Sequence, residues 1–181
     1  YPKNFEQKIG FSEVRDLLNA CCLTTLGKAL VEQMNFSTDA ETINRHMEQI
    51  RELRHIRQEE EGLPLGTFFD IRESMKRLRL VGTYLEEEEL FALQRTLQTI
   101  HALVKFLKAE EENEGGLTAY DYPALAALTE GVIPMPTVIQ RIMQVLDKFG
   151  HIRDNASPEL AAIRRELSRT QNSISGILNN I

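Results

Sequence analysis

The last part of the chain, Ser157-Pro158-Glu159-Leu160-Ala161-Ala162-Ile163-Arg164-Arg165-Glu166-Leu167, opens the segment that decides the fold and continues to Ile181. Serine is a favoured helix N-cap, and a proline directly after it suits the first helical position. From there one set of positions recurs at alternating steps of three and four residues: Leu160, Ile163, Leu167, Thr170, Ile174, Ile177 and Ile181. Two positions in seven form a seam narrower than the buried side of a globular helix, so we predict a coiled-coil helix over residues 157–180.

A single coiled-coil strand cannot bury its own seam, and the chain reaches Ile181 without a C-cap or a partner strand. We therefore expect the chain to be truncated from a longer protein, with this helix as the first part of a lever. The alternative is an ordinary terminal helix that packs on its own domain.

Two further long helices are expected nearer the amino terminus. Over residues 38–60, Thr38 and Glu41 stand at capping-box spacing, and one apolar stripe follows at Ile43, Met47, Ile50, Leu53 and Ile56. Over residues 86–108, four glutamates occupy the first turn, where the helix dipole favours anions. Leucine, isoleucine and valine then recur at Leu90, Leu93, Leu97, Ile100, Val104 and Leu107.

These patterns define the fold class as all-α, with a multi-helix core domain over residues 1–150 and a long carboxyl-terminal lever helix beginning in 151–181. Glycine and proline together supply 16 residues, which is sparse for a sheet protein. Residues 110–116 read as an acidic, solvated turn, and residues 150–154 are the only segment expected to be strand-like.

Composition narrows the classes of function. The 27 acids outnumber the 21 bases, giving a net charge of −6, and a domain that grips DNA by itself usually has a basic excess. Cys21 and Cys22 are adjacent, which suits reduced thiols better than a disulfide framework. Because no apolar run approaches membrane-spanning length and no signal segment opens the chain, we expect a cytoplasmic protein without a membrane partner.

No pattern of catalysis stands out. A phosphate-binding P-loop needs a Ser or Thr after Gly-Lys, but Ala29 follows Gly27-Lys28, and Cys22 takes the place of the first glycine. The four histidines are scattered, and the single Glu-x-x-His, Glu52 to His55, is interpreted as surface rather than as half of a metal site. We therefore expect no catalytic, cofactor-binding or metal-binding residue here.

Two basic stretches could meet DNA phosphates. One comprises Arg72, Lys76, Arg77 and Arg79, and the other comprises Arg45, Arg51, Arg54 and Arg57. We regard the first as the candidate phosphate-contacting set. The alternative, which the many acids favour, is that both are solvated faces paired with neighbouring carboxylates.

In order along the chain, several stretches resemble the amino-terminal part of MutS-type proteins, in the second-paralogue branch that suppresses recombination and carries a nuclease. They are 4–6 with 9–11, Cys22-Leu23-Thr24-Thr25-Leu26-Gly27-Lys28, Phe69-Asp70-Ile71-Arg72, 78–85, and 150–160 running on to Ile163-Arg164-Arg165. In that family a stretch similar to 150–160 links the core to the outgoing lever helix, which pairs with a returning helix.

The resemblance implies a non-catalytic core and lever segment of a DNA-binding ATPase that acts on branched or mismatched DNA. The parent protein would use ATP and magnesium, dimerise mainly through its ATPase domain, and carry an endonuclease domain. The returning helix and both enzymatic domains have no counterpart in this sequence. The alternative is a free-standing helical adaptor that self-associates through its last helix.

Overall fold

The computed structural model describes residues 4–58, 63–112 and 118–178. Its helices are α1 (Phe5–Lys8), α2 (Phe11–Cys21), α3 (Thr25–Glu32), α4 (Ala40–Gln58), α5 (Arg72–Arg77), α6 (Glu87–Leu107), α7 (Pro123–Ala126), the 3-10 turn η1 (Ala127–Thr129), α8 (Pro136–Val145) and α9 (Pro158–Leu178). A short hairpin, β1 (Glu110–Glu112) and β2 (Thr118–Tyr120), follows α6. The all-α prediction is confirmed, and α4, α6 and α9 begin and end within two residues of the predicted bounds.

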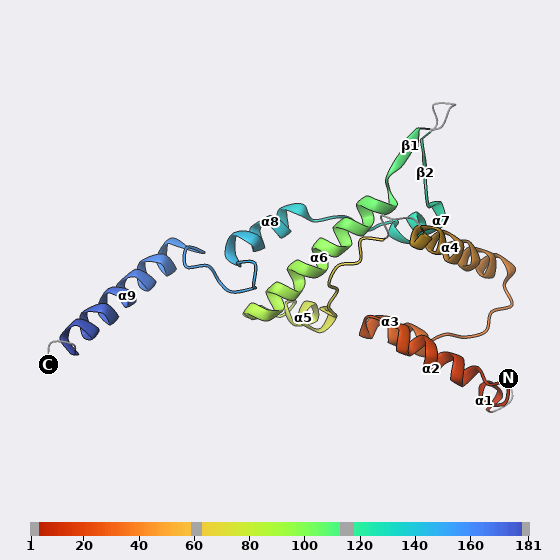
Figure 1. Ribbon diagram of the computed structural model, residues 1–181, viewed down its shortest axis with the longest axis horizontal. Helices are drawn as coiled ribbons and strands as arrows, with labels where there is room; N and C mark the ends of the chain where they lie inside the picture. Colours follow the sequence, from red (N-terminus) through yellow and green to blue (C-terminus); the bar gives the residue numbers. More distant parts are fainter. Residues whose placement is uncertain (1–3, 59–62, 113–117, 179–181) are drawn as a thin grey trace.

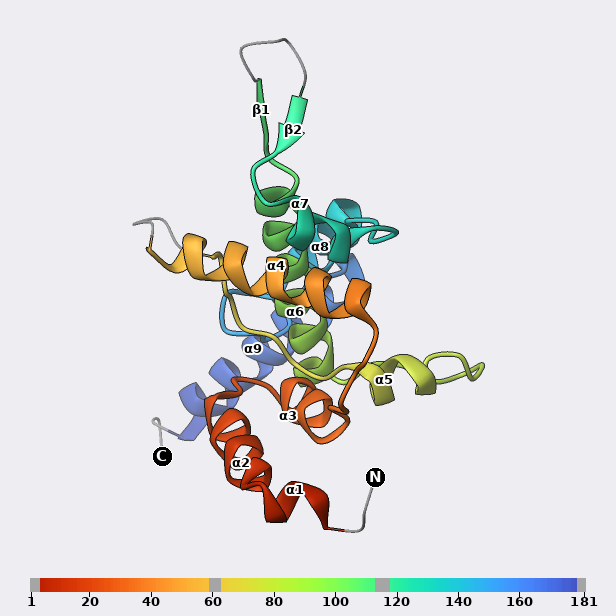
Figure 2. The same cartoon turned by 90° about the vertical axis from the view of Figure 1, so that its right-hand side faces the viewer.

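The elements form three groups along an extended molecule (Figure 1). Helices α4, α6, α7 and α8 make a central body, in which α6 packs against α7 and α8 while α4 packs against α7. Helices α1 to α3 pack on one another at one end, and α9 extends away from the body at the other. Turned by a right angle, the same arrangement shows α5 and its following turn projecting sideways (Figure 2).

The core of the body is small. Ile56 of α4 is completely buried among Leu107, Tyr122 and Leu125, and Phe106 stacks on the Tyr122 ring with centroids 5.9 Å apart. Ile139 and Ile142 of α8 and Leu146 directly after it are also buried, and α8 packs against α6. These contacts fix the point from which the chain leaves toward α9.

Helix α6 is covered on its polar side as well as on its predicted apolar stripe. Thr96 and Thr99 are buried, because the extended segment before α5 runs along the helix. The Phe69 amide donates to Thr96 Oγ1 at 3.0 Å, and Thr99 Oγ1 donates to the carbonyl of Thr67 at 2.9 Å. The covered surface of α6 therefore includes two threonines as well as the predicted apolar stripe.

Three local expectations are corrected. The amide of Thr42 donates to Asp39 Oδ2 at 3.0 Å, so Asp39 rather than Thr38 caps α4. Residues 110–112 form a strand that pairs antiparallel with 118–120, in the register Glu110 to Tyr120, instead of a turn; residues 113–116 lie outside the described part. Residues 150–154 were therefore not the only strand-like segment, although Ile152 does form an isolated bridge with Leu146.

The third correction concerns the side that α4 turns to the body. Gln49, Glu52 and Ile56 share one side of the helix and face α7. The predicted inward stripe lies mostly outside, with Ile43, Met47, Ile50 and Leu53 all exposed and Ile56 alone buried. The amphipathic pattern correctly identified an apolar face, but this face has no cover within the described residues.

Candidate functional site

The connection between α8 and α9 is the most elaborately hydrogen-bonded loop of the described chain, and we call residues 146–154 the root. The root doubles back on itself: the Arg153 amide donates to the carbonyl of Val145 at 2.8 Å, and the Asp147 amide donates to that of His151 at 2.8 Å. The carboxylate of Asp147 accepts from the amides of His151 and Phe149 at 2.9 and 2.8 Å. These bonds, that of His151 foremost, hold the pKa of Asp147 below its usual value.

Gly150 allows the root to lie flat against α6. Its φ of +92° belongs to the left-handed region that other residues rarely adopt, and it is buried. A Cβ at this position would lie 2.7 Å from Cγ of Phe91, in α6. Backbone conformation and close approach therefore both require glycine.

Side chains from two helices clamp the root. Glu87, in the first turn of α6, accepts from the Ile152 amide at 2.5 Å and lies 3.5 Å from Nδ1 of His151. Nε of Arg153 donates to the carbonyl of Leu146 at 2.7 Å. From α9, Arg164 forms an ion pair with Asp154 and donates to the carbonyl of Ile152 at 3.4 Å. The direction in which α9 leaves the body is thus set by contacts to α6, to α8 and within α9 itself.

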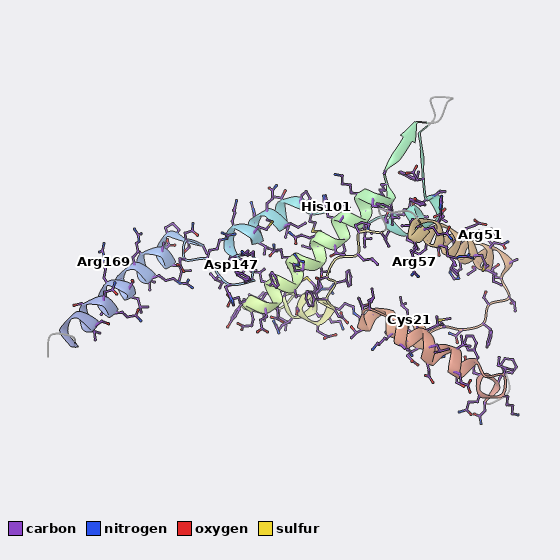
Figure 3. The ribbon with its side chains drawn as sticks, in the orientation of Figure 1. Cys21, Arg51, Arg57, His101, Asp147 and Arg169 are labelled. Carbon is purple, nitrogen blue, oxygen red and sulfur yellow. The ribbon has the colours of Figure 1, made fainter. Side chains whose placement is uncertain are left out.

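Beyond the root, α9 leaves its seam uncovered. The predicted cap is present, since the Leu160 amide donates to Ser157 Oγ at 3.1 Å, and Leu160 is half-buried. Ile163, Leu167 and Ile174 are 62%, 58% and 53% exposed, and Thr170 is exposed with its hydroxyl bonded to the carbonyl of Glu166. The side chain of Ile177 and all of Ile181 lie outside the described residues. Figure 3 shows Arg169 on this helix, far from the rest of the chain.

The candidate phosphate-contacting residues lie together on and after α5, but three of the four are engaged by acids. Arg72 forms two bonds to Asp70, at 2.8 and 2.7 Å, and this arginine holds the pKa of Asp70 down to about 2. Lys76 pairs with Glu73 at 2.7 Å, and Arg77 pairs with Glu89 of α6. Only Arg79 is exposed without an ion pair among the described residues. A phosphate would have to compete with these carboxylates, so their role in DNA contact stays a prediction.

Fewer of the arginines of α4 are engaged in ion pairs. Arg51 pairs with Glu48, and Arg45 donates to the hydroxyl of Thr42 at 3.3 Å. Arg54 and Arg57 are exposed, line shallow hollows with Gln58, and form no ion pair within the described part of the chain. Of the two basic stretches, this one leaves more positive charge available.

The described residues bring few reactive side chains together. Among the described residues no three His, Cys, Asp or Glu side chains come together to hold a metal ion. Glu52, interpreted from sequence as surface, is half-buried and accepts from the amides of Ala124 and Leu125 at 2.9 and 2.7 Å, so it caps α7. A hollow of about 360 Å³ beside the root is lined by Phe69, Phe91 and Phe149, with Glu87 and Glu88 at its edge. These carboxylates would repel the triphosphate of a nucleotide.

Sequence reasoning did not single out Glu87, Asp147, Arg153 or Arg164 as a cluster. The first stands in a run of four glutamates that reads as a solvated helix start. The spacing of an aspartate three residues before a glycine, Asp147 to Gly150, was the available signal of a tight turn.

Among the described helices, none combines the length and the apolar character that a membrane span requires.

Comparison with known proteins gives a consistent result. No profile of a known protein family matches the chain. Curated relatives do: an endonuclease MutS2 from Geobacillus sp. (strain WCH70) is 31% identical over 172 residues, which covers 94% of this chain and 21% of the relative. The endonuclease MutS2 proteins of Halalkalibacterium halodurans and Ligilactobacillus salivarius are 28% and 27% identical, over 87% and 98% of the chain.

Proteins of one name thus match the chain over nearly its whole length. The chain is similar to one segment of the MutS2 proteins, as the resemblance read from the sequence predicted. The chain spans about a fifth of the length of the curated relatives it matches.

Proposed function

We propose that this chain is a non-catalytic core and lever segment of a MutS-like DNA-binding ATPase that acts on branched or mismatched DNA and suppresses recombination. In this proposal the body receives movement from a nucleotide-driven ATPase domain, and α9 carries it toward the end that encloses DNA. ATP and magnesium would belong to that other domain, as would the contacts of a homodimer.

The observation that carries the proposal is the rigid root beneath an uncovered helix. A long helix transmits displacement from end to end only if its base does not pivot. Here the base is held by Glu87 from α6, by Arg153 to the end of α8 and by Arg164 from α9. The exposed seam of Ile163, Leu167 and Ile174 is what a returning helix would cover.

The test is to break the mechanical connection without removing any side chain. Two glycines inserted after Asp154, in a MutS2-length protein that carries this segment, should leave basal ATP hydrolysis intact and abolish its stimulation by branched DNA. The matched control inserts two glycines after Gly131, in an exposed turn before α8 that takes no part in the root contacts. Unchanged stimulation in the first variant would refute the lever role.

The exposed seam also favours a second candidate, a helical adaptor that self-associates through α9. The two functions differ in stoichiometry: a lever needs one returning helix from its own protein, whereas an adaptor pairs α9 with α9 of another copy. Cross-linking between copies through cysteines placed along the seam of the MutS2-length protein would support the adaptor.

A further inference from the structure

The amino-terminal helices form a small unit of their own. Arg15 of α2 ties it together, donating to Glu6 at 2.7 Å and to the carbonyls of Val31 and Met34. Phe36 also packs on it, with its ring centroid 5.7 Å from that of Phe5 and 5.3 Å from that of Phe11. We call residues 4–36 the amino-terminal unit.

This unit presents an apolar stripe that its own packing does not use. Arg15 and Asn19 of α2 face α3, where they contact Val31 and Glu32. On a different side of α2, at helical spacing, lie Val14, Leu17, Leu18 and Cys21. Val14 is 45% exposed and Leu17 is 68% exposed, and Cys21 is an exposed free thiol.

Helix α4 presents a matching stripe. Its side toward α7 carries Gln49 and Glu52, and the nearly opposite side carries Ile43, Met47 and Ile50 followed by Arg54 and Arg57. A stripe of three large apolar side chains, extended by two arginines that form no ion pair with any described residue, suits a helical protein partner better than water. Glu13, bordering the stripe of α2, offers the opposite charge.

The amino-terminal unit and α4 are neighbours both in the sequence and in space. In Figures 1 and 2 the amino-terminal unit lies below α4 in both views. Figure 3 labels Arg57 at the edge of α4 nearer the amino-terminal unit in that view, and Cys21 at the edge of the unit nearer α4. Residues 33–39 join the two, and seven residues span at most about 25 Å. A tether this short holds the unit near α4 at an effective concentration of about a millimolar, which a separate partner would have to exceed.

We propose that the amino-terminal unit docks on α4 through these stripes, with Val14, Leu17, Leu18 and Cys21 against Ile43, Met47 and Ile50. The occupant of the outer face of α4 is thus the chain's own first three helices, hinged at residues 33–39. Docking would cover the stripe that the sequence predicted to be buried, and would add a layer to the body on the side of α4 away from α7.

Cys21 can be used to test this docking by disulfide formation, because it lies in the stripe of α2 and Cys22 is the only other cysteine of the chain. In a Cys22→Ser background, one cysteine is placed along α4 in four variants: Ile43→Cys, Met47→Cys, Ile50→Cys and Arg54→Cys. A disulfide needs Cα atoms within roughly 7 Å of each other. At least one variant should form an intrachain disulfide with Cys21 under mild oxidation, measured by gel mobility and intact mass.

The matched control is Arg45→Cys in the same background, since Arg45 is exposed but lies toward the other side of α4. Its disulfide should form at least about tenfold more slowly, as expected for a thiol held on the far side of a packed helix. Equal rates, or no disulfide in any stripe variant, would overturn the proposal. Disulfide-linked dimers that increase with protein concentration would assign the face to a second copy instead.

A second measurement keeps the test independent of thiol chemistry. Ile50→Asp should speed hydrogen exchange of the α2 and α3 amides by about tenfold, because opening of the docked unit becomes easier, while the α6 amides stay unchanged. Asn44→Asp, also exposed on α4 but beside the stripe, is the control. If Ile50→Asp leaves α2 and α3 unaffected, the outer face of α4 is free and the proposal fails.

Discussion

The carboxylate of Glu87 accepts a hydrogen bond from the backbone amide of Ile152 at 2.5 Å, joining the first turn of α6 to a residue 65 positions further along the chain. The bond connects the body to the root of α9 at a single side chain. Its sequence neighbour Glu88 is exposed and has no partner among the described residues. The pair therefore separates the effect of the contact from that of a negative charge at the helix start.

Glu87→Ala should release the root from α6. A hydrogen bond to a charged acceptor contributes about 1.5–3 kcal/mol when buried, and partial exposure of Glu87 reduces this to about 1 kcal/mol. Urea denaturation should show that loss, and hydrogen exchange should show faster exchange at the Ile152 amide. Glu88→Ala removes the same charge from the dipole without touching the root, so a loss of equal size there would show that the contact is unimportant.

Gly150→Ala should be costly for two reasons. A side chain at a φ of +92° is strained, and its Cβ would collide with the ring of Phe91 at 2.7 Å. We expect a loss of about 2 kcal/mol or more in the free energy of unfolding. Gly131 provides the comparison, because its φ is +75° and a Cβ there meets nothing within 4 Å. Gly131→Ala should cost about 1 kcal/mol, and similar losses at the two positions would contradict close packing at the root.

The root should weaken in acid. The amides of His151 and Phe149 hold the pKa of Asp147 below the ordinary value of an aspartate. A lowered pKa in the folded state stabilises it above the unfolded value, and that contribution disappears as the pH falls through the folded pKa. Between pH 5 and pH 2, exchange of the Phe149 and His151 amides, corrected for intrinsic rates, should accelerate. Asp147→Asn should remove this pH dependence, and its persistence would assign the effect to other groups.

The existence of the three long helices, and their ends to within two residues, were predictable from the sequence, because periodicity and capping are local properties. The orientation of α4 was not. The stripe from Ile43 to Leu53 shows which side of the helix is apolar, but not whether its partner is in place. The orientation of α4 is set by polar contacts, because Glu52 caps α7 and so the side of α4 that carries Glu52 faces the body. The role of the Glu52 carboxylate cannot be read from its own helix, because the amides that it accepts from lie more than 70 residues further along the chain.

The hairpin and the root were not predicted, because both depend on contacts between separate segments of the chain. Three consecutive glutamates at 110–112 have low strand propensity, yet pairing with 118–120 supplies the backbone bonds that propensity does not. The root required Asp147, Glu87 and Arg164 to converge from different elements. The basic cluster on α5 was located correctly in sequence, but the ion pairs that occupy it depend on the course of the chain between Asp70 and Glu89.

Duplex or branched DNA should bind this chain weakly and with strong salt dependence. The net charge is −6, and non-specific affinities lie at roughly 10⁻⁴–10⁻⁶ M or weaker. Arg54→Ala with Arg57→Ala should reduce binding more than Arg72→Ala with Arg77→Ala, because only the second pair is already engaged by acids. Fluorescence anisotropy across a salt series measures both. Tight binding that survives about 200 mM salt would contradict the expected weak, salt-sensitive binding. A larger loss from the Arg72 and Arg77 variant would move the DNA contact to α5.

The exposed seam of α9 should drive self-association when no returning helix is present. Ile163, Leu167 and Ile174 are more than half exposed, and burial of an isoleucine or leucine side chain contributes roughly 1.5–3 kcal/mol. Sedimentation equilibrium should therefore show concentration-dependent dimers, and Leu167→Gln with Ile174→Gln should remove them. The melting temperature of the body should remain nearly unchanged, since neither side chain contacts it. The control is Ala162→Gln with Arg169→Gln, on the opposite side of the helix, which should leave association intact. Suppose instead that the seam variant stays monomeric at all concentrations, as does the parent chain, and melts about 10 °C lower, as loss of two buried side chains would require. The helix would then pack on its own domain, and the lever interpretation of α9 would be wrong.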